Sequence, residues 1–238
     1  MNNKPLSRYK LLKICECFSL ELTATQTANL LTLNRKTVNR YYRLIREAIW
    51  VVQLLEQQQF AGHIELDESY FGGYRKGLKG RSTKQKIPVF GMLKRGGKVY
   101  TQIVPDVKSS TLRKIIQDRT TLESVLYSDG FASYDGLVLD GYEHLRVNHR
   151  YELVNGRAHI NGIESFWSFA KQKLSKFYGI RPKDFHLYLK EMEFRFNNRA
   201  AGHSHVKKLI WAALQAYQLS HSVNTLGSSI ANFVKHKP

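Results

Sequence analysis

Apolar residues in the first fifty positions recur every three to four residues, the spacing of helices that bury one face. Thr23 is suited to cap a second short helix, and a break at Leu33 and Asn34 precedes a third helix over about 35–50. Polar and basic residues open this third helix: Arg35, Lys36, Asn39 and Arg40. The pattern is typical of a DNA-binding helix-turn-helix. The alternative is a three-helix bundle whose basic face is only solvated.

The apolar period changes after residue 60. Strands are predicted over 63–71, 87–93 and 98–104, with a tight turn at 95–98, and shorter strands over 124–128 and 145–147. Helices are predicted over 110–118, 160–178, 182–198 and 206–219. This order favours the α/β class, with a mixed sheet flanked by helices. The expected domains are 1–60 (helix-turn-helix and linker), 61–200 (catalytic) and 201–238 (C-terminal helix and tail).

The charge of the chain favours a polyanionic partner. There are 37 Lys and Arg residues against 19 Asp and Glu residues, so the net charge is +18 and the pI is about 9.9. Such a surface is typical of proteins that bind nucleic acid. Residues 61–147 nevertheless combine 14 basic with 10 acidic side chains. A protein that only coats DNA has little use for these acids, whereas a metal-dependent enzyme acting on phosphates needs them.

Several classes of protein are disfavoured by what the chain contains. Cys15 and Cys17 are too few for a disulfide framework or a zinc site, and we expect them to be small core residues. No stretch of about 18 uncharged apolar residues predicts a membrane span. Charged residues within the first 20 positions leave no room for a secretory signal, so we expect a cytoplasmic, nucleoid-associated protein.

Three acidic residues occupy positions suited to chemistry. Asp67 lies within an apolar strand, Asp129 ends a short apolar strand, and Glu164 lies early in a helix beside its core stripe. A buried carboxylate is costly unless it is paired or bound to a metal. Each acid also has an ordinary alternative: a bulge, a turn before Gly130, or a solvated helix face. Three such carboxylates can bind two divalent cations, and Mg²⁺ suits a site that keeps water and phosphate as further ligands.

Three sequence blocks resemble a known family. IELDESYFGG (64–73), YSDGFASY (127–134) and HINGIESFWSFAKQKL (159–174) are similar to the catalytic blocks of bacterial insertion-sequence transposases of the DDE class. The 34 residues between Asp129 and Glu164 are also similar to the spacing in that class. The resemblance covers about residues 61–200 and implies an RNase H-like core. It resembles most the small-element transposases with DE-x-x-x-GG and H-x-N-x-x-E blocks.

The resemblance implies roles for individual residues. Asp67, Asp129 and Glu164 would be catalytic metal ligands for two Mg²⁺ ions, with Mn²⁺ as a substitute. His159 would contact the scissile phosphate or orient a water molecule; the alternative is a residue at the helix start bonded to backbone. Glu68 points to the opposite face of its strand and ranks second as a ligand. Glu65 shares the face of Asp67 and could support the ligands.

Basic residues surround these blocks. A glycine-bearing segment follows the first acid, and further lysines follow Glu164 on its helix. We expect the following residues to contact the DNA backbone: Arg75, Lys76, Lys79, Arg81, Lys84, Lys171 and Lys173. For the segment after the first acid, the alternative is a solvated hairpin tip.

The sequence therefore predicts a DNA transposase. The N-terminal helices would recognise terminal inverted repeats in double-stranded DNA, and the core would cleave the element ends and join their 3′-hydroxyls to target DNA. Because two ends must be paired, a homodimer is expected in the active complex. Two alternatives stay open: an RNase H-like nuclease or resolvase without strand transfer, and a non-catalytic helix-turn-helix DNA-binding regulator.

Overall fold

The contacts divide the chain into two compact units, residues 1–56 with 198–237, and residues 57–197. The computed structural model describes residues 6–56, 59–72, 86–129, 132–134, 136–147, 159–177 and 179–222. Within these ranges no helix is long and apolar enough to cross a membrane. The first unit holds the N-terminal helices and the last helix, and the second holds the sheet.

The three N-terminal helices begin and end close to the predicted positions. They are α1 (Arg8–Ser19), α2 (Ala24–Leu31) and α3 (Arg35–Leu55). The Thr23 hydroxyl accepts from the Gln26 backbone N–H, and the Gln26 side chain accepts from the Thr23 N–H, which is a capping box. The Asn34 side chain accepts from the Lys36 N–H and caps α3. This helix runs on to Leu55, so the predicted end near residue 50 was too early.

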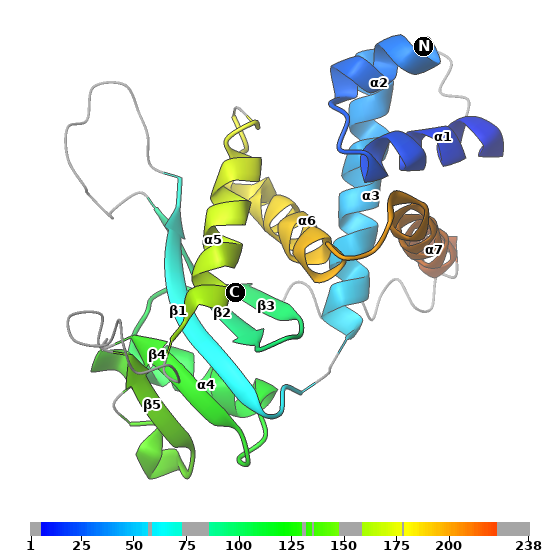
Figure 1. Ribbon diagram of the computed structural model, residues 1–238. Coiled ribbons are helices and arrows are strands. Elements are labelled where there is room, and N and C mark those ends of the chain that lie inside the picture. The colour runs from blue at the N-terminus through cyan, green and yellow to red at the C-terminus, as the bar shows by residue number, and fades with distance from the viewer. Residues whose placement is uncertain are drawn as a thin grey trace, which may run out of the picture. The chain divides into compact units, whose positions relative to one another are not determined.

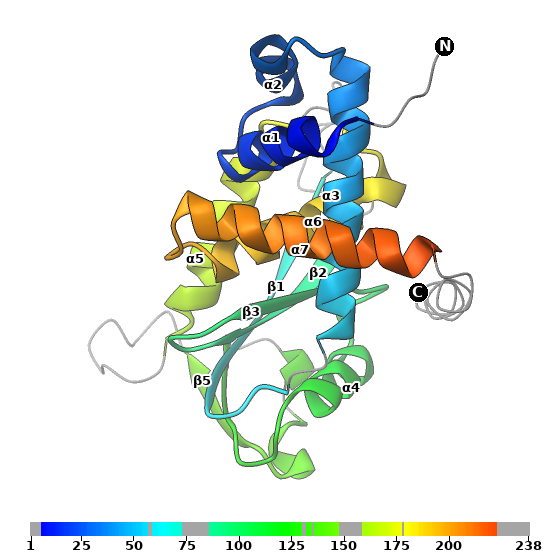
Figure 2. The ribbon, with the colours of Figure 1, turned by 90° about the vertical axis from the view of Figure 1, so that its right-hand side faces the viewer.

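The last helix, α7 (His203–Ser222), packs against α1 and α3 (Figure 2). The Tyr217 hydroxyl donates to the Glu47 carboxylate over 3.2 Å. The Arg8 guanidinium lies 5.8 Å from the centre of the Trp211 ring. The sequence analysis gave residues 201–238 a segment of their own, whereas these contacts join the helix to the N-terminal unit.

Cys15 and Cys17 are both buried in the N-terminal unit, as expected for small core residues. Burial raises the pKa of the Cys15 thiol to about 12 and also raises that of Cys17. Both thiols therefore stay protonated at neutral pH and serve as packing groups.

The second unit is built on a five-stranded mixed sheet with the order β3-β2-β1-β4-β5. β1 pairs antiparallel with β2, and β2 antiparallel with β3, whereas β4 lies parallel to both β1 and β5. Lys94 to Lys98 form the tight turn between the second and third strands. The strands are β1 (His63–Phe71), β2 (Ile87–Lys94), β3 (Val99–Ile103), β4 (Val125–Asp129) and β5 (Glu143–Val147).

Helices cover both faces of this sheet (Figure 1). One face packs on α5 (Asn161–Leu174) and α6 (Phe185–Asn197), and the other on α4 (Ser109–Arg119). α5 ends four residues before the predicted position 178, and the Pro182–Asp184 turn is a 3₁₀ helix that leads into α6. Two further 3₁₀ turns, Ala132–Tyr134 (η1) and Val138–Asp140 (η2), lie between β4 and β5. The predicted α/β class is confirmed, with the flanked mixed sheet that the RNase H-like expectation requires.

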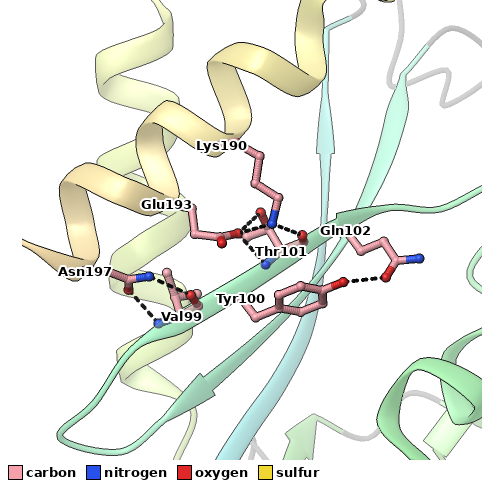
Figure 3. A network of polar contacts seen from close by, with 7 residues as sticks. All are labelled: Val99, Tyr100, Thr101, Gln102, Lys190, Glu193 and Asn197. Atoms are coloured by element: carbon pink, nitrogen blue, oxygen red, sulfur yellow. Dashed lines mark hydrogen bonds and ion pairs between the residues drawn. The ribbon is translucent and has the colours of Figure 1, made fainter. Parts of the chain in front are cut away.

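Side chains of α6 bond the backbone of the edge strand β3 (Figure 3). The Asn197 side chain accepts from the Val99 N–H and donates to its carbonyl, over 2.7 and 2.9 Å. Glu193 accepts from the Thr101 N–H and hydroxyl, and the Lys190 ammonium donates to the Thr101 carbonyl. Lys190 and Glu193 also form a buried ion pair of 2.7 Å. Helix side chains thus supply the hydrogen bonds that another strand would make at this edge.

Glu193→Ala should strongly destabilise the protein. It removes the carboxylate from the buried Lys190 ammonium and from the Thr101 N–H, and breaking a buried pair in this way costs about 3–5 kcal/mol. Urea denaturation of the full chain, followed by circular dichroism, measures the change. Glu123→Ala, at an exposed acid before β4, is the control and should change the free energy of unfolding by less than about 0.5 kcal/mol. Equal effects of the two variants would contradict the assigned role.

Candidate active site

Two of the predicted acids lie on neighbouring strands, Asp67 in the middle of β1 and Asp129 at the carboxyl end of β4. These strands pair in parallel, with Glu65 opposite Tyr127. Asp67 and Asp129 each follow two residues later, so they share one sheet face and adjacent strands. The described pairing of β1 with β4 ends at Glu65 and Tyr127, just before the two acids. The carboxyl ends of parallel strands are where α/β sheets usually bind their ligands.

The electrostatics of this pair are repulsive. Burial raises the pKa of Asp67 to about 7, and the charges of Glu68 and Asp129 add to the rise. The pKa of Glu68 is also raised, chiefly by burial and further by Asp129. Carboxylates that are buried and close to one another favour any positive charge that neutralises them, whether a proton or a metal ion.

Glu68 occupies the other face of β1, as the sequence analysis expected. Ile64 and Leu66, which share this strand face with Glu68, pack in the core beneath α4. The buried Tyr134 hydroxyl from η1 donates to the Glu68 carboxylate. Burial, and then the charge of Glu68, raises the pKa of Tyr134 well above its ordinary value, so the phenol stays a donor.

Helix α5 contacts Asp67 directly. The Trp167 indole Nε1–H donates to Asp67 Oδ2 over 2.9 Å. Trp167 lies so close to β2 that a Cβ at Gly91, the residue opposite Asp67, would approach the indole ring to 2.5 Å. Glu164 lies three residues before Trp167, in the first turn of α5, and is exposed. Residues three apart share a helix face, so Glu164 projects from the helix that adjoins the site.

A second carboxylate on the same strand face holds the start of α5. Glu65 is 1% exposed, and its Oε2 accepts from the Ile163 backbone N–H over 2.9 Å. Its Oε1 accepts from Arg95 Nε over 3.0 Å and lies 3.5 Å from His159 Nδ1. The Arg95 guanidinium also donates to the His159 carbonyl. The His159 side chain is half exposed, beside the site acids and at the start of the helix.

The donor set of the site suits a divalent cation in its chemistry. Oxygen ligands from neighbouring carboxylates are what Mg²⁺ prefers. Burial first, and then the charges of Glu68 and Asp129, raise the pKa of Asp67, and a bound cation would favour its ionised form. The structure brings Asp67 and Asp129 together and places Glu164 on the adjoining helix. In the part of the chain that the structure describes, no three Asp, Glu, His or Cys side chains form a group that could hold a metal ion.

The predicted DNA contacts fall into three groups. Arg35, Lys36, Asn39 and Arg40 are all exposed at the start of α3. On α5 the Lys171 ammonium lies 5.8 Å from the centre of the Phe71 ring at the end of β1, and Lys173 lies 5.7 Å from that of Phe169. The basic segment after β1 lies outside the described residues, and with it the following predicted contacts: Arg75, Lys76, Lys79, Arg81 and Lys84.

Sequence reasoning missed four residues that shape the site. Trp167 belongs to the apolar core stripe of its helix, and its indole also donates to Asp67. Arg95 was read as a turn residue, although it pairs with Glu65. Gly91 and Gly162 leave room for Trp167 and Glu65 respectively. The available signal was the presence of two acids, Glu65 and Asp67, on one face of a buried strand. Each buried carboxylate needs a hydrogen-bond donor, and the helix that packs on this face has to supply it.

Comparison with known proteins gives consistent matches. Residues 59–197 match the family described as ISXO2-like transposase domain. An uncharacterized transposase-like protein of Haemophilus influenzae is 48% identical over 101 residues, covering 42% of this chain and 82% of that protein. A protein in the transposable element ISH50 of Halobacterium salinarum is 30% identical over 155 residues, covering 56% of this chain and 52% of that protein.

Solved structures show only a loose similarity. The Mos1 mariner paired end complex with Mn matches with a TM-score of 0.36 at 12% identity, covering 92% of this chain and 79% of that chain. The Mos1 strand transfer complex matches with a TM-score of 0.34 at 12% identity, covering 92% and 78%. TM-scores of this size support no conclusion about the site.

The stability of the metal-free protein should depend on the ionisation of Asp67. An unfolded Asp ionises near pH 4, whereas the pKa of Asp67 in the folded protein is about 7. Between these values the folded state holds a proton that the unfolded state has lost, so stability falls as pH rises. Relative to Asp67→Asn, the wild type should lose stability from pH 4 to 7 and level off above pH 7. Urea denaturation in EDTA measures this, and a pH-independent difference would contradict it.

Proposed function

The chain belongs to the ISXO2-like transposase domain family, and we propose that it is a DNA transposase that cleaves element ends and joins them to target DNA. The observation that carries the proposal is the proximity of Asp67 and Asp129 on the neighbouring strands β1 and β4, next to the helix that bears Glu164. Neighbouring carboxylates beside basic side chains suit phosphoryl transfer, whereas a DNA-binding regulator does not need them.

Asp67, Asp129 and Glu164 would hold divalent cations, Mg²⁺ or Mn²⁺, in this proposal. When bound, such ions lower the pKa of a water molecule and offset the negative charge that develops on a reacting phosphate. The side chains have their own tasks. The Trp167 indole donates to one oxygen of Asp67 and would thereby fix the orientation of this carboxylate for a ligand. Lys171 and Lys173 extend beyond Glu164 on α5, where they would neutralise DNA phosphates.

The proposed reaction has two steps at one site. A water molecule attacks the phosphorus at the element end, and the bond to the 3′ oxygen breaks, which exposes a 3′-hydroxyl. That hydroxyl then attacks a target phosphodiester, and the displaced 3′ oxygen of the target takes up a proton. His159, half exposed at the start of α5, would orient the water or contact the scissile phosphate. No covalent bond between protein and DNA is required.

The N-terminal helices would recognise the element ends as a helix-turn-helix. α2 and α3 are joined by a loop of three residues. The first two helical turns of α3 expose basic side chains, with Asn39 between them. This supports placing α3 in the major groove. Since a transposition reaction joins two ends, two copies of the chain would act together as a homodimer.

Asp129→Ala should abolish cleavage in Mg²⁺ while binding to element ends survives. The variant removes one of the two juxtaposed carboxylates without altering the N-terminal helices. A gel assay of end cleavage and a binding titration measure the two properties. Asp118→Ala, at an exposed acid on α4, is the matched control and should cleave normally. Undiminished cleavage by Asp129→Ala would overturn the site, and cleavage without joining of pre-cut ends would favour a nuclease or resolvase.

Exchanging Lys36 and Asn39 for Ala together should weaken end binding and reduce its sequence preference. Lys36 supplies phosphate attraction, so the slope of log affinity against log salt should flatten by about 0.9 for that contact. Asn39 is suited to base edges, so its loss should cost about 1–3 kcal/mol of discrimination. Binding titrations at several salt concentrations, with matched and scrambled ends, test both effects. Lys10→Ala on α1 is the control, and an equal loss in that variant would contradict the groove assignment.

A further inference from the structure

We propose that Glu65 is a positioning residue that fixes helix α5, and with it Glu164, against the strand that carries Asp67. The proposal rests on the proposed function for its catalytic consequence, but its structural part can be tested without metal or DNA. Glu65 is not a catalytic residue in this account. Its role is to determine where the third acid stands relative to the first.

The first supporting observation is that one helix bonds two acids of the same strand. Glu65 and Asp67 share a face of β1, and both carboxylates accept N–H groups from α5. The donor to Glu65 is the backbone N–H of Ile163, immediately before Glu164, and the donor to Asp67 is the indole one turn later. Two bonds at two points along a helix restrict both its sliding along the strand and its rotation about its own axis. Glu164 lies between these two points.

The second observation is that both oxygens of the Glu65 carboxylate already accept hydrogen bonds. Oε2 accepts from α5, and Oε1 accepts from Arg95, whose side chain also donates to the carbonyl of His159 just before α5. The guanidinium stacks on the Tyr127 ring, with its carbon 3.7 Å from the ring centre. A carboxylate that is 1% exposed and bonded through both oxygens is suited to hold structure rather than to bind a metal ion.

The third observation is the close fit on both sides of the contact between α5 and the sheet. A Cβ at Gly162 would lie 2.7 Å from Glu65 Oε2 and 3.0 Å from a methyl group of Leu93. A Cβ at Gly91 would lie 2.5 Å from the Trp167 ring. The helix therefore cannot approach the sheet this closely with any larger residue at either position. The position of α5 therefore depends on Glu65, because the close packing leaves no free space in which the helix could shift.

The experiment compares three full-length variants. Glu65→Gln keeps the shape of the side chain and loses the charge that pairs with Arg95. Gly162→Ala disturbs the same contact from the helix side and leaves Glu65 in place. Glu193→Gln is the matched control, because Glu193 is also a buried carboxylate that fixes a helix, α6, to a strand, β3 (Figure 3). Each of the three variants disturbs a buried contact between a helix and a strand. An effect that arises from a general loss of stability should therefore appear in the Glu193→Gln control as well.

The first measurement needs neither metal nor DNA. The indole N–H resonance of Trp167 is recorded in ¹⁵N-labelled metal-free protein and assigned by its loss in Trp167→Phe, together with hydrogen exchange at the Ile163 amide. Glu65→Gln and Gly162→Ala should move the indole resonance and accelerate exchange at Ile163, whereas Glu193→Gln should change neither. An unmoved indole resonance in both Glu65→Gln and Gly162→Ala would overturn the positioning role.

The second measurement is end cleavage in Mg²⁺. Glu65→Gln and Gly162→Ala should lower kcat on the order of 10- to 100-fold with KM for DNA unchanged, because the ligand set is misplaced while DNA binding is intact. Glu193→Gln should retain the wild-type kcat. An equal fall of kcat in all three variants would reduce Glu65 to a general structural residue and overturn the proposal. If the wild type itself neither cleaves nor joins DNA, the proposed function fails, and the metal-free measurement still decides the position of α5.

Discussion

Two carboxylates on one face of β1 constrain the rest of the unit that holds the sheet. Glu65 and Asp67 lie in the middle of the sheet, where an unpaired negative charge is very costly. Both are satisfied by N–H groups that belong to α5, about a hundred residues further along the chain. The strand therefore needs the helix for its own stability. The same requirement brings the helix that bears Glu164 to the strand that bears Asp67.

The two acids divide their tasks through their surroundings. Glu65 is enclosed by cationic and N–H donors, which leaves its carboxylate no free role in chemistry. Asp67 accepts from the Trp167 indole but is buried beside two other carboxylates, so burial and then the neighbouring charges raise its pKa to about 7. In our proposal Glu65 fixes the position of α5, and Asp67 is the acid that would bind a ligand. In a chain of net charge +18, these clustered acids stand out from an otherwise basic composition.

In the unit that holds the sheet, the two large helices are attached by different contacts. α6 bonds the backbone of an edge strand, so its polar side chains replace a missing strand and protect the edge from further pairing. α5 bonds carboxylates in the interior of the sheet, so its contacts also determine the site. The contacts of α6 serve stability alone, whereas those of α5 would couple stability to the proposed function. Variants at Glu193 and at Glu65 can therefore separate a loss of stability from a displacement of the site.

Much of the architecture was determined by the sequence alone. The periods of the apolar residues predicted all five strands and the order of the helices, and the cap at Thr23 and the break at Leu33 and Asn34 marked where the second and third helices begin. The resemblance of three short blocks to a transposase class agrees with the family that matches residues 59–197. Local patterns succeed here because a period depends only on which face of an element is buried.

The partners of the individual side chains were decided only by the tertiary structure. No local pattern shows that Glu65 meets the Ile163 N–H, that Trp167 both packs and donates, or that α7 joins the N-terminal helices. Periodicity reports that a face is buried and not what it is buried against. Helix lengths also shifted where tertiary contacts or turns, rather than propensity, set the end, as at Leu55 and Leu174. The positions of the acids could be read along the chain, but their pairing required the sheet register and the helix packed above it.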